Sequence, residues 1–322
     1  MNSDKKILVS VIVLTFNSAE YIGRCLKYLC KQKEKSFEVI VVDAGSSDNT
    51  INIIKSYTEK LNIKFVLALN TNMGQARNVG IKKSVGEYVC FCDSDDYFFP
   101  NKIFDQLNLL KNNKFFDATY YNAFHFRTNS SKKYLKNRGY VPSKNLLAEL
   151  IKNQCVNINS LMIKKRGSNG KVVLFPNNKS GKYAEDWQYL LNLCINNYNF
   201  YYTDKPLSAV EERTNSHTSE KIQYLMKYHI LNYLLLNKRR ILLNKKVSFL
   251  NFYYYLNIHR IKFIVACLLC DQIDFLISKS RLIGYPLVIF FSIPFYHLIA
   301  KRNLFKFFVR SYINQKNIAR II

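Results

Sequence analysis

Short apolar runs alternate with amphipathic segments of helical length from residue 8 to residue 126. The apolar runs read LVSVIVLT, FEVIVVD, IKFVLAL and EYVCFCD, and segments 20–32, 50–60, 74–84 and 101–112 follow them in turn. Such alternation is typical of βαβ units, in which helices cover both faces of a mostly parallel sheet. The sequence therefore predicts a Rossmann-like α/β fold, whose ligands bind beyond the carboxyl ends of the strands.

The pattern divides the chain into three parts. Residues 1–112 hold the regular alternation, and residues 113–218 are less regular, with a helix expected to start near Glu185. Residues 219–322 are basic, aromatic and aliphatic, and they predict a helical extension. The first two parts are expected to form one catalytic domain, in which the second part shapes the site for a second substrate.

The most apolar piece of the extension is segment 282–300, LIGYPLVIFFSIPFYHLIA, which contains no Asp, Glu, Lys or Arg. Its length is close to the ~20 residues that span a bilayer, but Pro286 and Pro294 would each remove a backbone hydrogen bond and kink a helix. An interfacial or re-entrant segment is therefore favoured over a membrane-spanning helix or an ordinary packed helix.

The charge balance predicts an anionic partner. The 322 residues include 48 Lys and Arg against 22 Asp and Glu, a net charge of +26. Such a chain attracts nucleic acid, anionic lipid or phosphorylated small molecules. Many of the aromatic residues lie in the last third of the chain beside Lys and Arg, which suits a membrane surface better than a nucleic-acid arm.

The cysteines and the first apolar run bear on location. Eight cysteines lack the paired C-x-x-C spacing of a zinc site, which indicates reduced thiols in a cytoplasmic protein. The run from Leu8 to Phe16 alternates β-branched residues and is read as a buried strand rather than a secretion signal. We therefore expect a cytoplasmic protein that associates peripherally with the inner face of the cell membrane.

Polar side chains end three of the expected strands: Thr15, Asp43 and Asp93. On one parallel sheet these ends converge on a single cleft. Asp43, in VVDAGSSDNT, is placed to accept hydrogen bonds from a base or a ribose. The alternative is that Asp43 and GSSDNT form only a turn and a helix cap, which Asp, Gly and Ser also favour.

The cluster Asp93-Ser94-Asp95-Asp96 indicates a metal. Carboxylates this close repel one another unless a cation lies between them, and Mg²⁺ or Mn²⁺ held by one or two carboxylates, water and diphosphate oxygens fits. The alternative is an acidic turn that caps the helix near Asn101. Upstream of this cluster, Gly74 opens a helix whose free amides can face a phosphate, and Arg77 lies one turn further on.

Taken together, these motifs resemble the family 2 glycosyltransferases. SVIVLTFN, VVDAGSSDNT, NMGQARNVGI, GEYVCFCDSDD and AEDWQYLL occur in the family's order and approximate spacing, over about residues 8–215. The resemblance implies the GT-A fold and inversion at the anomeric centre. It implies a nucleotide-sugar-binding half in residues 1–112 and an acceptor-binding half in residues 113–218. In the first half it implies nucleotide contacts by Thr15, Asp43 and Arg77 and a ribose contact by Asp93. It also implies metal binding by Asp95, with a second metal contact by Asp96.

The same resemblance extends to the acceptor half. Glu185 and Asp186 match the family's Glu-Asp pair, in which the Asp is the expected general base for the acceptor hydroxyl. An acidic pair favoured by the dipole at a helix start is the plainer interpretation. Arg213 and His217 match loosely a basic loop over the diphosphate, and His217 fits a surface residue equally well. Asp43-Ala44 replaces the common Asp-Asp, which leaves the base preference open.

The sequence thus predicts a glycosyltransferase that uses a nucleotide-sugar donor, foremost a UDP-sugar, and a glycan or lipid-linked acceptor in surface polysaccharide or glycolipid synthesis. A nucleotidyltransferase is the enzymatic alternative, but it requires a Gly-rich, basic signature after the first strand, where this chain reads TFNSAEYI. A nucleic-acid-binding protein would leave the acidic cleft unexplained. A noncatalytic sugar- or nucleotide-binding relative remains as a third interpretation.

Overall fold

The computed structural model describes residues 6–127, 133–135, 145–167, 170–176, 183–212, 223–244 and 247–269. The chain divides into two compact units, residues 1–214 and 215–322. The boundaries expected after residues 112 and 218 stay predictions, and segment 282–300 lies outside the described residues.

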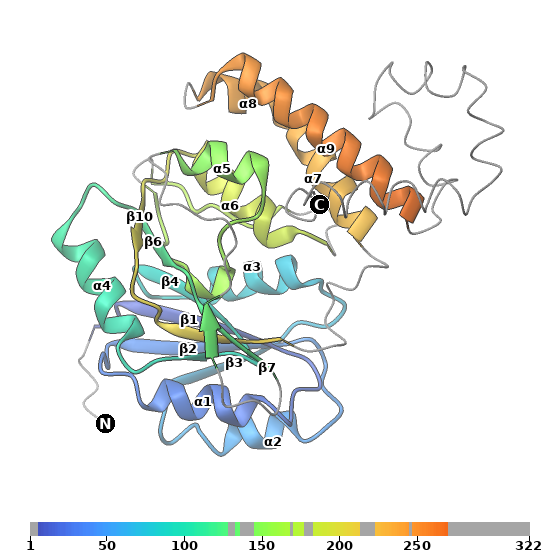
Figure 1. Ribbon diagram of the computed structural model, residues 1–322. Helices are drawn as coiled ribbons and strands as arrows, with labels where there is room; N and C mark the ends of the chain where they lie inside the picture. The colour runs from blue at the N-terminus through green and yellow to red at the C-terminus, as the bar shows by residue number, and fades with distance from the viewer. Residues whose placement is uncertain are drawn as a thin grey trace. The chain divides into compact units, whose positions relative to one another are not determined.

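The first unit is built on a seven-stranded sheet with the order β10-β6-β9-β4-β1-β2-β3 (Figure 1). β1 pairs in parallel with both β2 and β4, β2 pairs in parallel with β3, and β10 with β6, whereas β9 is antiparallel to β4 and β6. This confirms the predicted mostly parallel α/β sheet. The strand bounds are β1 Val9–Thr15, β2 Phe37–Asp43, β3 Ile63–Leu67, β4 Tyr88–Asp93, β6 Ala118–Tyr121, β9 Met162–Lys164 and β10 Phe200–Thr203.

Helices cover both faces of this sheet. α1 (Ile22–Cys30) and α2 (Thr50–Lys55) lie on one face and α3 (Met73–Lys83) on the other (Figure 1), while α4 (Lys102–Asn112) contacts β6. The central strands are apolar on both sides, and every side chain of β2 is buried. α3 approaches β1 closely at Gly80, where an added Cβ would lie 2.5 Å from Ile12 Cγ2. Glycine therefore lets α3 pack directly on the strand that leads to Thr15.

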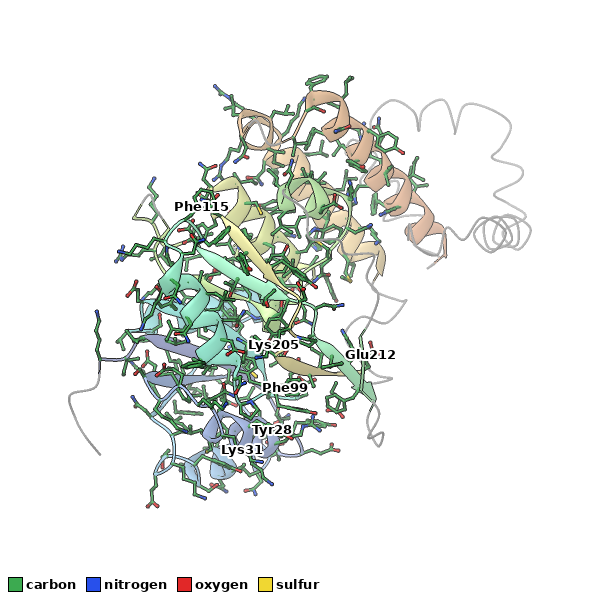
Figure 2. All side chains as sticks on the ribbon, turned by 60° about the vertical axis from the view of Figure 1, so that its left-hand side comes forward. Tyr28, Lys31, Phe99, Phe115, Lys205 and Glu212 are labelled. Carbon is green, nitrogen blue, oxygen red and sulfur yellow. The ribbon has the colours of Figure 1, made fainter. Side chains whose placement is uncertain are left out.

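A smaller four-stranded sheet, with the order β5-β11-β7-β8, stands beside the acidic turn after β4. β5 (Tyr97–Phe98) follows that turn directly, and β11 (Ser208–Glu212) pairs with both β5 and β7 (Phe124–Arg127); β8 is Lys133–Leu135. Residues 118–127 are thus divided between the two sheets, as β6 and β7. An aromatic cluster packs this sheet against α1, with Tyr28 and Tyr97 stacked at 4.3 Å; Figure 2 labels its members Tyr28 and Phe99.

The remaining elements of the first unit are α5 (Leu146–Lys152), a 3₁₀ turn η1 (Ile158–Ser160) and α6 (Glu185–Ile195). α6 begins at the residue expected from the sequence. Ala184 precedes it with φ 64°, a left-handed conformation that turns the chain sharply into the helix. α6 contacts α5 and α3, so its first turn is held next to the helix that carries Arg77.

The second unit contains α7 (Gln223–Leu236), α8 (Lys238–Leu243) and α9 (Phe249–Leu269). α7 and α9 lie side by side (Figure 1) and bury apolar side chains such as Ile230, Leu234, Phe252 and Phe263. Within the described residues, no helix has the length and apolar character needed to cross a membrane.

Candidate active site

The carboxyl ends of the three central strands meet at one edge of the large sheet. Thr15 of β1 is in register with Asp43 of β2, and Leu14 of β1 is in register with Asp93 of β4. The structure therefore brings Thr15, Asp43 and Asp93 together, as parallel strand ends should be. One edge of the sheet thus collects the polar residues that end the predicted strands.

Asp43 organises the turn that follows it. Its fully buried carboxylate accepts hydrogen bonds from Gly45 N at 2.8 Å, Ser46 N at 2.7 Å and Ser46 Oγ at 2.5 Å. Thr15 is also buried, and its Oγ1 makes no hydrogen bond to a described residue. The hydrogen bonds of Asp43 are thus those of the turn interpretation, because its carboxylate caps the turn that follows β2. Nucleotide contacts by Thr15 and Asp43 stay predictions.

Arg77 links the strand-end edge of the large sheet to the first turn of α6. Its guanidinium donates to Asp93 Oδ1 and to Glu185 Oε1, both at 3.0 Å, and only 3% of the side chain is exposed. The guanidinium also lies over the Phe175 ring, 5.5 Å from its centroid. Asp93 and Glu185 therefore share the positive charge of Arg77, which the sequence analysis expected to contact the nucleotide. The nucleotide role of Arg77 stays a prediction.

The acidic turn after β4 presents its carboxylates in different directions. Asp93 is partly exposed, with 35% of its side chain accessible. Asp96 is buried and accepts from Glu211 N at 2.8 Å and from Asn159 Nδ2. Burial and the neighbouring Asp93 charge raise the pKa of Asp96 well above its usual value. Asp95, between them, is half-buried.

Asn159, in η1, is a functional candidate that the sequence reasoning missed. Its amide oxygen accepts from Asp93 N at 3.1 Å, and its Nδ2 donates to Asp93 Oδ2 at 3.2 Å and to Asp96. Only 1% of Asn159 is exposed. One side chain thus fixes both the backbone and the carboxylates of the acidic turn. The sequence around it, NINS, predicts a turn but does not indicate which residues its side chain contacts.

Arg24 holds the same turn from the other side and was also missed. Its Nη2 donates to Asp95 O at 2.5 Å and to Glu211 Oε2 at 2.6 Å. The guanidinium lies over the rings of Tyr97 and Phe126, at 5.6 and 5.1 Å. Because Glu211 N also donates to Asp96, α1 and β11 together set the backbone position of Asp95.

Asp186 stands in the first turn of α6 and is half-buried. Gln154 Nε2 donates to its Oδ2 at 2.5 Å, and Trp187 N donates to its Oδ1 at 2.8 Å. The neighbouring Glu185 is buried and faces Arg77. Burial and the Asp186 charge raise the pKa of Glu185 to about 7, against the opposing effect of Arg77.

The raised pKa of Glu185 predicts a dependence of stability on pH. The folded state binds the Glu185 proton more tightly than the unfolded state, so this contribution to the free energy of unfolding is complete below about pH 4.5 and is lost as pH rises to about 7. Glu185→Gln removes the titration. The difference in unfolding free energy between wild type and this variant, from urea melts, should fall across that window and level off above it; a flat difference from pH 4.5 to 8 would contradict the raised pKa.

The residues present fit a hard divalent cation that takes part of its coordination from the substrate. Among the described residues, no group of three or more His, Cys, Asp or Glu side chains is arranged to hold a metal alone. Mg²⁺ needs only one or two carboxylates when phosphates and water complete its shell. The partly accessible Asp95 can supply one of them. Asp93 is also partly accessible, but both of its oxygens, like those of Asp96, face protein donors. The metal role of Asp96 stays a prediction that this geometry does not favour.

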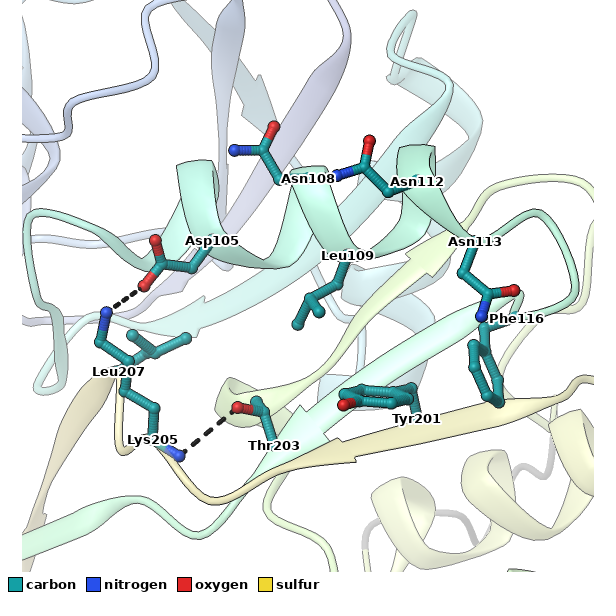
Figure 3. A pocket seen from close by; sticks show the side chains of 10 residues that line it. All are labelled: Asp105, Asn108, Leu109, Asn112, Asn113, Phe116, Tyr201, Thr203, Lys205 and Leu207. Carbon is teal, nitrogen blue, oxygen red and sulfur yellow. Dashed lines mark hydrogen bonds and ion pairs between the residues drawn. The ribbon is translucent and has the colours of Figure 1, made fainter.

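Two predicted site residues, Arg213 and His217, lie outside the described residues. A groove of about 480 Å³ between α4 and β10 contains none of the predicted site residues. Figure 3 shows the Asp105–Lys205 ion pair, 2.5 Å long, at one end and Phe116 with Tyr201 at the other. The strand ends, rather than this groove, gather the chemistry-bearing side chains.

Comparison with known proteins shows similarity to a family of glycosyltransferases. The model of glycosyl transferase family 2 matches residues 10–172. An uncharacterized glycosyltransferase of Rickettsia bellii is 36% identical over 140 residues, which cover 42% of this chain and 20% of that protein. The poly(ribitol-phosphate) beta-N-acetylglucosaminyltransferase TarS of Staphylococcus aureus is 50% identical over 93 residues, or 27% of this chain and 16% of TarS. The matches thus span a fifth or less of these two relatives.

Solved structures share the fold. TarS residues 1–349 in complex with UDP-GlcNAc superpose with a TM-score of 0.59 and 24% identity, covering 81% of this chain and 72% of that one. The mannosyltransferase PcManGT from Pyrobaculum calidifontis, in complex with GDP-Man and Mn²⁺, gives a TM-score of 0.56 and 16% identity over 94% of this chain and 88% of that one. The predicted GT-A-like arrangement of sheet and helices is confirmed by these likenesses.

Proposed function

We propose, from the premise that the chain belongs to glycosyl transferase family 2, that it transfers a sugar from a nucleotide-sugar donor to a hydroxyl of an acceptor. The observation that carries the proposal is the bridge made by Arg77. It ties Asp93, at the donor edge of the sheet, to Glu185, the residue before Asp186, with both bonds 3.0 Å long. The bridge thus holds the start of α6, which carries the carboxylate of Asp186, close to the sheet edge where a nucleotide would bind.

In this proposal Asp186 is the general base. An attacking hydroxyl must lose its proton as it bonds to the anomeric carbon, and a half-buried carboxylate can accept that proton. Gln154 orients the carboxylate through its 2.5 Å hydrogen bond to Oδ2, and the start of α6 stabilises its charge. The proton moves from the hydroxyl to Asp186, while the donor's diphosphate departs from the opposite face of the sugar.

Asp95, together with the donor's phosphates and water, would hold a divalent cation, Mg²⁺ or Mn²⁺. When bound, that ion would neutralise the charge of the diphosphate leaving group. The protein's own contribution is to fix the turn: Asn159 holds Asp93, and Arg24 holds the Asp95 carbonyl at 2.5 Å. Preorganised carboxylates need no rearrangement when the donor enters.

A UDP-sugar is the donor we favour, supported by the TarS complex with UDP-GlcNAc. We further propose a glycan or lipid-linked acceptor, a role in surface polysaccharide or glycolipid synthesis, and a cytoplasmic location at the inner face of the membrane. The +26 charge and the aromatic, basic second unit support the membrane as partner. Nucleic acid is not a partner in this proposal.

The donor assignment is tested by calorimetry with UDP-, GDP-, CMP- and dTDP-sugars, first with Mn²⁺ and then with EDTA. We expect one nucleotide to bind in a metal-dependent way, and Asp95→Ala to weaken that binding at least about tenfold. Asp105→Ala, which removes a carboxylate paired with Lys205 on α4, is the matched control and should bind as wild type does. Equal affinity of wild type and Asp95→Ala in both buffers would reject Asp95 as the metal ligand, and no binding of any donor would favour a noncatalytic relative.

A further inference from the structure

Helix α9 of the second unit is apolar on two opposite faces. Phe252, Leu256 and Phe263 are almost completely buried on one face. Leu250, Tyr254 and Ile261 lie on the other, together with the exposed Asn257, because spacings of four, seven and eleven residues return to the same side of a helix with about 3.6 residues per turn. The exposed fractions of the three apolar residues are 79%, 61% and 60%. We call these three apolar residues the outer face of α9.

An apolar face with this exposure requires an explanation. Surface helices normally turn polar side chains outward, and a helix that is apolar all round is buried or sits in a membrane environment. Large exposed apolar patches mark sites of protein or membrane interaction.

The charge of the second unit selects the occupant. Residues 223–244 contain four Lys or Arg and residues 247–269 contain two, and neither segment contains Asp or Glu. Near the start of α9, Lys238 Nζ lies 4.7 Å from the centre of the Tyr253 ring. A second copy of the chain would bring two such cationic units together, and their charges would repel. Nucleic acid would match the positive charge but would leave the apolar side chains of the outer face without a complementary surface. An anionic lipid surface matches both the charge and the apolar side chains.

We propose that the outer face of α9 docks on an anionic phospholipid surface, with the helix lying in the plane of the membrane interface. Leu250, Tyr254 and Ile261 enter the boundary between headgroups and acyl chains. The Lys and Arg of this unit other than Lys262, which is only 3% exposed, contact lipid phosphates. The proposal deepens the membrane location given above and rests on it, but it does not depend on transfer activity. It assigns membrane contact to α9 itself rather than to segment 282–300.

The test is flotation of the full chain with vesicles of phosphatidylcholine alone or with a quarter phosphatidylglycerol. The test variant is Leu250→Glu with Ile261→Glu. The control, Val85→Glu with Phe115→Glu, makes the same change in charge at apolar residues of the first unit that are 63% and 68% exposed. Thermal melts confirm that each variant folds, and donor binding is measured separately, so that failure of the proposed function is recognised independently.

We expect wild type and control to float with the anionic vesicles and not with the neutral ones, and the α9 variant to bind at least about tenfold less. Equal loss in the α9 variant and the control would show that charge alone decides binding and would overturn the proposal. Absence of vesicle binding by wild type would overturn it as well. So would light scattering that shows a dimer in wild type and a monomer in the α9 variant, because the outer face would then bind a second copy.

Discussion

Replacing Asp186 with Asn is expected to lower kcat by about 10²- to 10⁴-fold while donor affinity changes little. The carboxamide keeps nearly the shape of the carboxylate, and its oxygen can still accept the hydrogen bond from Gln154 or from Trp187 N. It cannot take the acceptor's proton at neutral pH. Turnover is measured as release of the nucleotide in the presence of acceptor, and donor affinity by calorimetry.

Two variants sharpen the assignment of the base. Gln154→Ala leaves the carboxylate of Asp186 in place but removes its 2.5 Å hydrogen bond, so we expect a smaller loss of kcat than for Asp186→Asn. Asp105→Asn, far from α6 in the sequence and on α4, should leave kcat unchanged. If Asp186→Asn kept near-normal turnover, the proton would go elsewhere; if it lost donor binding as strongly as turnover, Asp186 would belong to the donor site.

The central sheet could be predicted from the sequence because its middle strands are mostly apolar. β2 is buried at every position, and β1 and β4 nearly so, which leaves the chain few other ways to bury these runs. Once the strands are parallel neighbours, the polar residues at their ends must meet. The convergence of Thr15, Asp43 and Asp93 therefore follows from a local pattern.

The contacts that hold the acidic turn could not be predicted in this way. Arg24 reaches Asp95 O across 71 positions and Glu211 across 187, and Asn159 reaches Asp93 across 66. None of these residues has a local pattern that names its partner, because the contacts depend on how the small sheet packs on the large one. The division of residues 118–127 between two sheets escaped prediction for the same reason.

For Arg77, the motif predicts the position on a helix but not the residue that its side chain contacts. NMGQARNVG placed it on the first turns of a helix at the cleft, and α3 does begin at Met73 with a capping box between Asn72 and Gln75. The sequence could not show that a carboxylate 108 positions later would share the guanidinium. Its two interpretations, nucleotide ligand and structural bridge, make different predictions.

Arg77→Met should lower the free energy of unfolding by about 3–5 kcal/mol, because removing one partner of a buried ion pair leaves the other charge uncompensated. The loss should be largest above pH 7. Below it, Glu185, whose pKa is already raised to about 7, can take up a proton and remove its own charge. Urea melts at pH 5.5 and pH 8 measure both values.

The double variant Arg77→Met with Glu185→Gln separates the two interpretations. As a structural bridge, Arg77 is coupled to Glu185, so the double variant should recover part of the stability lost by Arg77→Met alone. Stability losses that simply add would contradict the bridge. In the recovered double variant, donor binding then reports on the nucleotide role. Affinity close to wild type would make Arg77 a positioning residue for Asp93 and α6, whereas loss of binding in a folded protein would place the guanidinium on the donor.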